Sequence, residues 1–287
     1  MADTADHITL LGVKGGPAIR QGGAMPTSSL MRFGKQTVLI DCGIGVARST
    51  VESGVSLLDI DAIFITHLHS DHVLELGPLL YTAWTTGLGH KVRVFGPDGI
   101  DVYWDNFLHA MAFDYAIRLD DEGRPPLRDL VEVTTFGPGP VTDEGDLSVT
   151  AFRVEHPPVT DCFALRFEAG GKRIVFSADT RYFPPLAEFA KGADILVHEA
   201  MLTAGVDNLV ARTPGADRLR EHLMASHTPA DDAGRIAQAA MVGKLVLNHL
   251  VPADDPDFSE TDWTAEVSKT WNGPVFIGRD GLVIPIT

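Results

Sequence analysis

The stretch that most constrains the fold is residues 60–72, which read Ile-Asp-Ala-Ile-Phe-Ile-Thr-His-Leu-His-Ser-Asp-His. The apolar run 63–65 predicts a short buried strand. Four potential metal ligands follow it: His67, His69, Asp71 and His72. Because residues two apart on an extended strand point the same way, the first two can face one point, and the last two can face a second point past the strand end. A lone histidine is most often a surface or packed residue, but this density of imidazole and carboxylate predicts a metal site.

Composition is that of an ordinary globular protein, with 287 residues, 45% hydrophobic and 22% charged. We expect residues 1–287 to form a single domain. No apolar run is long enough to span a bilayer, and the short acidic start, residues 1–6, does not resemble a secretory signal. Cys42 and Cys162 are the only cysteines, which excludes a disulfide framework and makes the cytoplasm the expected location.

The charge balance is strongly acidic, with 39 acidic against 23 basic residues and a net charge of −16. A surface of this sign repels a phosphate backbone unless a local basic patch offsets it, and the sequence has no Lys/Arg cluster. The charge therefore argues against a nucleic-acid partner.

Apolar and β-branched runs predict strands that alternate with helices, an α/β pattern. Expected strands cover 8–12, 28–33, 36–41, 91–95, 147–154, 163–167, 173–176, 193–197 and 244–247, and expected helices cover 72–86, 100–113, 183–191, 229–241 and 259–270. Residues 114–130 are expected to form a surface loop, and residues 202–226 an irregular segment that contains His222.

The segment His67-Leu68-His69-Ser70-Asp71-His72 resembles the His-x-His-x-Asp-His signature of the metallo-β-lactamase superfamily. That resemblance implies a four-layer αβ/βα sandwich with two metals at one edge of the sheets. It also implies that His156, at a strand end before two prolines, completes the first site. Asp179, in a Ser-Ala-Asp-Thr segment close to the family's Ser-Gly-Asp-Thr, would bridge both metals, and Asp41 would support the metal-bearing loop.

The resemblance thus implies two ligand sets that share one carboxylate. The first metal would take His67, His69, His156 and Asp179, and the second would take Asp71, His72, His249 and Asp179. Zinc is the expected metal, although manganese and iron also occupy His/Asp sites. A purely structural site is not expected, because such sites are usually closed and rich in cysteine.

Three motifs in the C-terminal half resemble the ribonuclease Z and arylsulfatase-like branch: His198-Glu199-Ala200, Ser226-His227-Thr228 and Leu247-Asn248-His249-Leu250. The resemblance implies that His227 donates a proton to the leaving group and that Glu199 orients it. Such a carboxylate fixes the imidazole tautomer and keeps a proton available near neutral pH. One departure is clear, because the Gly/Pro-rich basic arm of ribonuclease Z is absent. The short segment 136–140 is followed by acidic residues instead.

These features predict a dinuclear metal-dependent hydrolase that uses a metal-bridging hydroxide, with Asp71 to orient it. We expect a small-molecule substrate: an ester, lactone, amide, phosphodiester or sulfate ester. The alternative is a ribonuclease Z-type endonuclease that processes the 3′ end of transfer RNA. The sequence leaves the oligomeric state open, and the resemblance makes a homodimer one possibility, because members of that branch are often dimeric. The candidate pocket residues are Trp84, Tyr103, Trp104, Thr160 and Met201.

Overall fold

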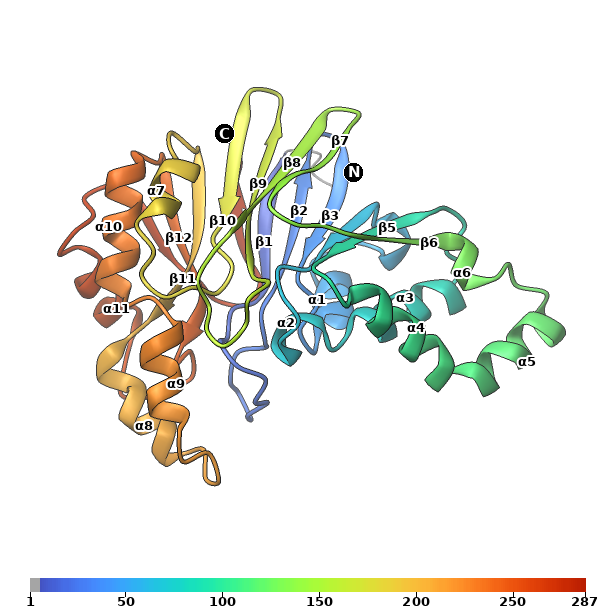
Figure 1. Ribbon diagram of the computed structural model, residues 1–287, viewed down its shortest axis with the longest axis horizontal. Coiled ribbons are helices and arrows are strands. Elements are labelled where there is room, and N and C mark those ends of the chain that lie inside the picture. Colours follow the sequence, from blue (N-terminus) through green and yellow to red (C-terminus); the bar gives the residue numbers. More distant parts are fainter. Residues whose placement is uncertain (1–5) are drawn as a thin grey trace.

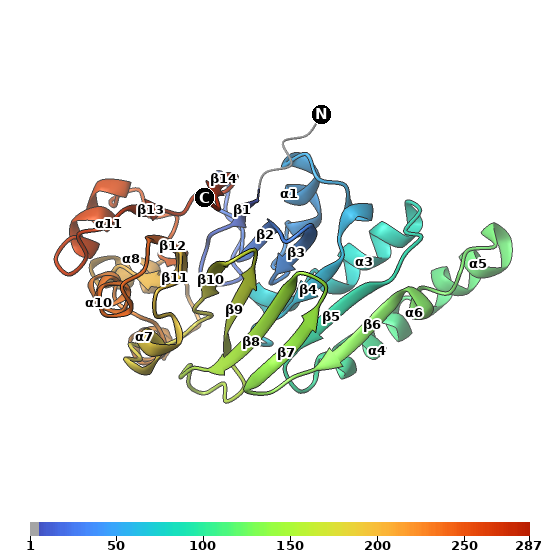
Figure 2. The ribbon, with the colours of Figure 1, turned by 90° about the horizontal axis from the view of Figure 1, so that it is seen from above.

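The computed structural model describes residues 6–287, so most of the acidic start of the chain lies outside the described residues. Two seven-stranded sheets form the centre of the molecule (Figures 1 and 2). The first has the order β14 (Leu282–Pro285), β1 (His7–Gly12), β2 (Ser28–Phe33), β3 (Gln36–Ile40), β4 (Ala62–Phe64), β5 (Val92–Gly96) and β6 (Val131–Thr135). The second has the order β13 (Val275–Ile277), β12 (Lys244–Val251), β11 (Ile195–Met201), β10 (Lys172–Phe176), β9 (Phe163–Ala169), β8 (Leu147–Arg153) and β7 (Gly139–Glu144).

Helices cover the outer face of each sheet (Figure 2). The first group is α1 (Val46–Glu52), α2 (Ser70–Val73), α3 (Leu76–Thr85), α4 (Ile100–Ala110), α5 (Ala112–Glu122) and α6 (Leu127–Leu130). The second group is α7 (Pro185–Phe189), α8 (Val206–Ala211), α9 (Leu219–Ser226), α10 (Ala230–Ala240) and α11 (Glu260–Val267). The expected four-layer αβ/βα sandwich is confirmed. No helix of the described part, residues 6–287, is long and apolar enough to cross a membrane.

The alternation of inward and outward side chains builds three cores. The middle core lies between the sheets, where Phe64 of β4 stacks on Phe95 of β5 at 4.8 Å between ring centroids and meets the edge of Phe167 of β9 at 5.2 Å. The two outer cores seal each sheet against its helices. Burial of apolar surface on both faces of both sheets holds the sandwich together.

Parallel pairing brings the chemistry to one edge. β3 and β4 pair in parallel, and so do β10, β11 and β12. Parallel neighbours end on the same side of a sheet, so the loops after these strands gather at one edge. The motifs that carry His67 to His72, Asp179 and His249 follow these strands or lie at their ends, whereas His156 follows the antiparallel β8 and His227 follows α9.

Three expected elements differ from the structure. The expected helix 72–86 is two helices, because the chain breaks between α2 and α3, where the Glu75 carboxylate accepts hydrogen bonds from the backbone N–H groups of Gly45 and Ala47. Pro78 does not break the helix, because it lies in the first turn of α3, where no backbone donor is needed. The expected loop 114–130 is mostly helical, since α5 continues to Glu122 and α6 follows it. The expected irregular segment 202–226 contains α8 and α9.

Candidate metal centre

Four of the seven predicted ligands lie on the segment that follows β4. The strand ends at Phe64, so His67 and His69 stand in the loop beyond it rather than on it. The alternation argument for this pair is therefore wrong in its geometry, although the loop still brings the two rings to 4.8 Å between centroids. Asp71 and His72 belong to the single turn of α2 that follows.

The other predicted ligands come from the second sheet, and Asp179 lies at the centre. Its Oδ2 is 3.0 Å from His249 Nε2, 3.4 Å from His72 Nε2, and 3.8 Å from both His67 Nε2 and His156 Nε2. One carboxylate that faces four imidazoles from both predicted ligand sets has the position that a bridging ligand needs. Asp179 follows β10, and His249 lies in β12 beside it in the same sheet.

The structure brings all seven side chains together. The ligand atoms of His67, His69, His156 and Asp179 lie within 4.8 Å of one another, as do those of Asp71, His72 and His249. The first group is the first predicted ligand set, and the second group is the second predicted set without Asp179, which groups with His249 and His227 instead. The role of each residue as a ligand stays a prediction, which the donor chemistry can test.

The donor atoms fit divalent cations. His67 Nε2, His72 Nε2 and Asp179 Oδ1 are buried, and none has a hydrogen-bond partner among the described residues. Burial of a polar atom without a partner costs free energy, so such atoms are rare unless something else satisfies them. Imidazole nitrogens and carboxylate oxygens, without cysteine, suit zinc and related transition metals. The residues present therefore fit the two metals that the fold implies.

Burial and neighbouring charges shift the pKa values of side chains in this centre. Burial lowers the pKa of His156 to about 4. Burial would also lower the pKa of His249, but the Asp179 carboxylate outweighs it and raises that pKa to about 10. The pKa of Asp71 is lowered, because His72 and His249 beside it outweigh the opposing effect of its own burial. Binding of a metal to His249 must displace the proton that Asp179 stabilises there, so it couples to pH.

A chain of hydrogen bonds behind the ligands orients two of the rings. Asp41 Oδ2 accepts from His72 Nδ1 at 2.8 Å and from Thr66 Oγ1 at 2.9 Å. Thr66 Oγ1 in turn lies 3.1 Å from His67 Nδ1 and can accept its proton. Both rings therefore present Nε2 to the centre. Partners of this kind fix the tautomer and orientation of a ligating histidine, which is the supporting role that the resemblance implies for Asp41.

Backbone groups position two further ligands. The Ser226 carbonyl accepts from His156 Nδ1 at 3.0 Å, which turns Nε2 toward Asp179. The Gly16 backbone N–H donates to Asp71 Oδ2 at 2.8 Å. The neighbouring Gly15 has no room for a side chain, because a Cβ would meet the His249 ring at 2.8 Å. The glycine turn after β1 therefore closes tightly over this part of the centre.

The predicted proton donor stands beside the ligands. His227 Nδ1 lies 3.1 Å from Glu199 Oε2, and the His227 ring is 5.3 Å from those of His156 and His249. The Thr180 backbone N–H holds the other carboxylate oxygen, Glu199 Oε1, at 2.7 Å. His227 can also group with Asp179 and His249 within 4.8 Å, so its geometry admits a ligand as well as a donor.

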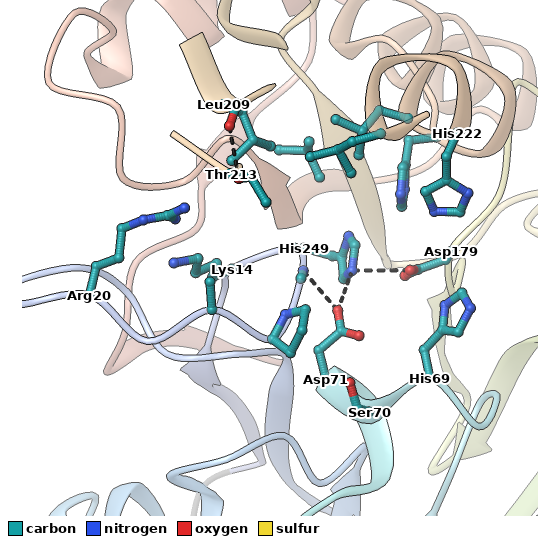
Figure 3. A pocket seen from close by; sticks show the side chains of 18 residues that line it. Lys14, Arg20, His69, Ser70, Asp71, Asp179, Leu209, Thr213, His222 and His249 are labelled. Carbon is teal, nitrogen blue, oxygen red and sulfur yellow. Dashed lines mark hydrogen bonds and ion pairs between the residues drawn. The ribbon is translucent and has the colours of Figure 1, made fainter. Parts of the chain in front are cut away.

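A cavity of about 290 Å³ opens directly onto the centre (Figure 3). Its lining comes from four places: the turn after β1, the segment around α2, helices α8 and α9, and the predicted ligands and donor themselves. The lining residues are Lys14, Gly15, Gly16, Pro17, Ala18, Arg20, His69, Ser70, Asp71, Asp179, Leu209, Thr213, Leu219, His222, Leu223, His227, His249 and Val251.

None of the five candidate pocket residues lines this cavity. Trp84 and Trp104 are buried in the core between the first sheet and its helices, with Tyr103 packed against them. Met201 packs behind the cavity wall. The aromatic residues of α3 and α4 thus fill the core, and the pocket walls are aliphatic.

Two basic side chains at the cavity, Lys14 and Arg20, were not identified from the sequence. The side chain of Lys14 is nearly buried, and its Nζ lies 2.9 Å from Asp254 Oδ2. Arg20 Nη1 lies 3.1 Å from the same oxygen. Figure 3 shows Lys14 and Arg20 beside each other at the cavity. The only carboxylates in the lining are Asp71 and Asp179, both candidate ligands. Lys14 and Arg20 share Asp254, so these three side chains together carry one net positive charge beside the cavity, although the chain carries −16. The sequence did contain a signal for this pair, because Lys14 and Arg20 stand on either side of the glycine turn Gly15-Gly16.

Comparisons with known proteins agree with this architecture. Residues 7–215 match the family model described as Anti-Pycsar protein Apyc1. The chain is 32% identical over 277 residues to a protein named ribonuclease Z from Mycobacterium bovis, covering 96% of each chain. It is 34% identical over 280 residues to another from Mycolicibacterium gilvum, covering 96% of this chain and 94% of the relative.

Two solved structures share the fold across nearly their whole length. The metallo-β-lactamase fold protein YhfI from Bacillus subtilis has a TM-score of 0.72 at 25% identity, with 97% of this chain and 99% of YhfI covered. The short form of human tRNase Z has a TM-score of 0.69 at 20% identity, with 98% and 99% covered.

These relatives correct one prediction from the sequence. The expectation of a small-molecule substrate, with a nucleic-acid partner unlikely, is wrong, because the relatives that match over 96% of the chain are named ribonuclease Z. The physical reason is that net charge averages over the whole surface and does not report the local charge at a cavity, which Lys14 and Arg20 line. The chain belongs to the ribonuclease Z branch of the metallo-β-lactamase superfamily, it belongs to the family described as Anti-Pycsar protein Apyc1, and it is a metal-dependent hydrolase.

Proposed function

We propose that this protein is an endonuclease that cleaves precursor transfer RNA at its 3′ end and depends on two divalent metal ions. Zinc is the metal that we expect in both sites. The observation that carries the proposal is likeness to ribonuclease Z over 96% of the chain. The match to the Apyc1 family model ends at residue 215, before His227 and His249. The ribonuclease Z relatives extend over the whole predicted machinery, so they are the better guide to its chemistry.

Two divalent cations, when bound, would act as Lewis acids on the scissile phosphate and would lower the pKa of water toward about 7. His67, His69, His156 and Asp179 would hold one cation, and Asp71, His72, His249 and Asp179 the other. Asp71 would also orient the attacking water, with its Oδ2 fixed by the Gly16 N–H.

His227 would protonate the leaving oxygen. Its Nδ1–H donates to Glu199, so a proton on Nε2 is the one available to a substrate. After that proton leaves, the neutral ring keeps its Nδ1–H on Glu199, and the carboxylate stays bound to the Thr180 N–H. General acid catalysis by a positioned histidine is worth roughly 100- to 10,000-fold in rate.

Lys14 and Arg20 would attract the phosphate backbone at the cavity. They do so without the Gly/Pro-rich basic arm, which this chain lacks. Their shared partner Asp254 holds both side chains in place, so little side-chain entropy remains to be lost on binding. The assignment to the cytoplasm and the prediction of one domain over residues 1–287 stay predictions.

The test is cleavage of a precursor transfer RNA that carries a 3′ trailer, by protein loaded with zinc or with manganese. A single cut at the 3′ end of the acceptor stem, mapped by sequencing the products, is the expected result, with binding that weakens steeply as salt rises. The His227→Ala variant controls for contaminating nuclease. If the protein hydrolyses bis(p-nitrophenyl) phosphate but does not cut the precursor, the proposal of phosphodiester hydrolysis stands and the proposal of a transfer-RNA substrate fails.

A further inference from the structure

Helices α8 and α9 form a hairpin that projects past the edge of the sheets beside the metal centre (Figure 1). Three leucines of this hairpin, Leu209, Leu219 and Leu223, line the same cavity as the candidate ligands. Figure 3 shows the hairpin residues on one side of the cavity and Asp71, His249 and Asp179 on the other. One cavity therefore has an apolar wall and a polar, metal-binding floor.

The apolar wall is fixed rather than loose. Leu223 is 6% exposed and packs with Met201, Val206 and Val251, which tie it to β11 and β12. Leu209 and Leu219 pack against this cluster and remain partly exposed. A partly exposed aliphatic surface inside a concave site is ready to bury an apolar ligand group.

We propose that this wall binds the base of the single nucleotide that adjoins the scissile phosphodiester. The inference rests on the proposed function, because the phosphate of that nucleotide would lie at the candidate metal ligands. Its base would then lie on the three leucines, with the polar side chains of Thr213 and His222 at the same wall. Enzymes that act on an unstacked nucleotide hold its base between apolar or aromatic side chains in this way.

The size and charge of the cavity fit one nucleotide. Its volume of about 290 Å³ is close to the lower end of the range for small-ligand pockets, which is roughly 300–1,000 Å³. A duplex cannot enter such a space, so the nucleotide must be unpaired. Lys14 and Arg20 also line the cavity, apart from Leu209 and Thr213 in Figure 3, and a further phosphate of the RNA backbone would find a cation there. The subsite therefore selects a single-stranded junction.

Direct binding tests the subsite without any cleavage. Zinc-loaded protein is titrated calorimetrically with inorganic phosphate, uridine 5′-monophosphate and uridine 3′-monophosphate. We expect at least one nucleotide to bind roughly tenfold more tightly than phosphate. The two nucleotides differ in whether the phosphate is on the 5′ or the 3′ oxygen. The one that binds more tightly shows whether the wall holds the base on the 3′ or the 5′ side of the scissile phosphate. Equal affinity for phosphate and both nucleotides would overturn the proposal.

Substitutions in the wall provide the matched comparison. Leu209→Ser and Leu219→Ser should each remove most of the advantage of the nucleotide and leave phosphate binding unchanged. Met224→Ser is the control. Met224 lies on α9, the helix of Leu219, is 40% exposed and does not line the cavity. Circular dichroism checks that each variant folds. If the leucine variants and the Met224 variant bind the nucleotide equally well, the wall does not hold the base.

An RNA substrate with an abasic residue next to the cut separates this inference from the proposed function. The abasic residue should lower kcat/KM for the wild type and have little further effect in Leu219→Ser. An equal penalty in both proteins would refute the subsite while cleavage itself still supports the nuclease. If no precursor is cut but nucleotide binding depends on the leucines, the transfer-RNA proposal fails and the subsite stands.

Discussion

Glu199 and His227 meet beside the metal centre although they come from different elements of the fold. His227 Nδ1 lies 3.1 Å from Glu199 Oε2, where Glu199 belongs to β11 and His227 directly follows α9. The Thr180 N–H binds the second carboxylate oxygen. The carboxylate is thus held from one side and orients the imidazole on the other. The arrangement fixes which ring nitrogen can reach a substrate.

His227→Ala should lower the single-turnover cleavage rate by roughly 100- to 10,000-fold, because the leaving oxygen loses its proton donor. Glu199→Gln should lower it less, since the amide oxygen can still accept from Nδ1–H. Zinc content, measured by mass spectrometry, is the decisive second readout. It should stay at the wild-type value in both variants, and a loss of zinc in His227→Ala would make this residue a ligand instead of a donor.

Asp179→Ala and His69→Ala should each abolish activity and leave the fold largely intact. Asp179 faces four imidazoles from both predicted sites, so its loss should empty both, whereas loss of His69 should weaken mainly one. Activity, zinc content and far-ultraviolet circular dichroism measured together separate these effects. Full turnover by either variant would contradict the ligand assignment.

Asp41→Asn should weaken zinc binding by roughly 10- to 100-fold without removing any ligand. The carboxylate accepts from His72 and Thr66, and through Thr66 it also orients His67. An amide can satisfy only part of this network. Competition with a chromophoric chelator measures the affinity. Thr37→Val, on the neighbouring strand β3 and away from the ligands, is the control, and an Asp41 variant with wild-type affinity would remove the positioning role.

The site could be read from the sequence because ligand chemistry is local. His67 to His72 lie within six positions, and the motifs that carry Asp179 and His249 are short and follow predicted strands. Parallel pairing then brings the strand ends to one edge, which is a general property of α/β sheets. Asp71, which follows β4 of the first sheet, and His249, which lies in β12 of the second, are 178 positions apart in the chain, and the face-to-face packing of the two sheets brings these edges together.

The pocket walls could not be read in the same way. Val206, Leu209 and Val210 have helical spacing, and so do Leu219 and Leu223, but each helix is too short for a clear periodic signal. Helix α5 has no fully buried residue, and only Tyr115 and Leu119 pack partly buried against the first core. Its exposed face has ion pairs between Arg118 and both Asp114 and Glu122, at the four-residue spacing that supports a helix. These elements depend on tertiary packing or surface pairs that the apolar pattern does not contain.

His198 gives the fold a specific sensitivity to acid. Its side chain is 1% exposed in β11, Nδ1 donates to the Glu199 carbonyl at 2.6 Å, and Nε2 has no hydrogen-bond partner among the described residues. Burial therefore lowers its pKa to about 4. The unfolded chain takes up this proton near pH 6.5, whereas the native state does not. The stabilisation is complete above about pH 6.5 and is lost as the pH falls toward 4, a loss that approaches about 3 kcal/mol.

His198→Asn should flatten this part of the pH dependence, because asparagine can keep the hydrogen bond to the Glu199 carbonyl and does not titrate. Urea unfolding of metal-free protein at several pH values between 7 and 4 measures the free energy of unfolding. Other buried histidines contribute to both proteins, so the difference between the two curves isolates His198. His109→Asn, at an exposed position of α4, controls for the loss of one imidazole. If wild type and His198→Asn lose stability in parallel over this range, a proton on His198 is tolerated in the folded protein, and the acid sensitivity must come from the metal-binding histidines.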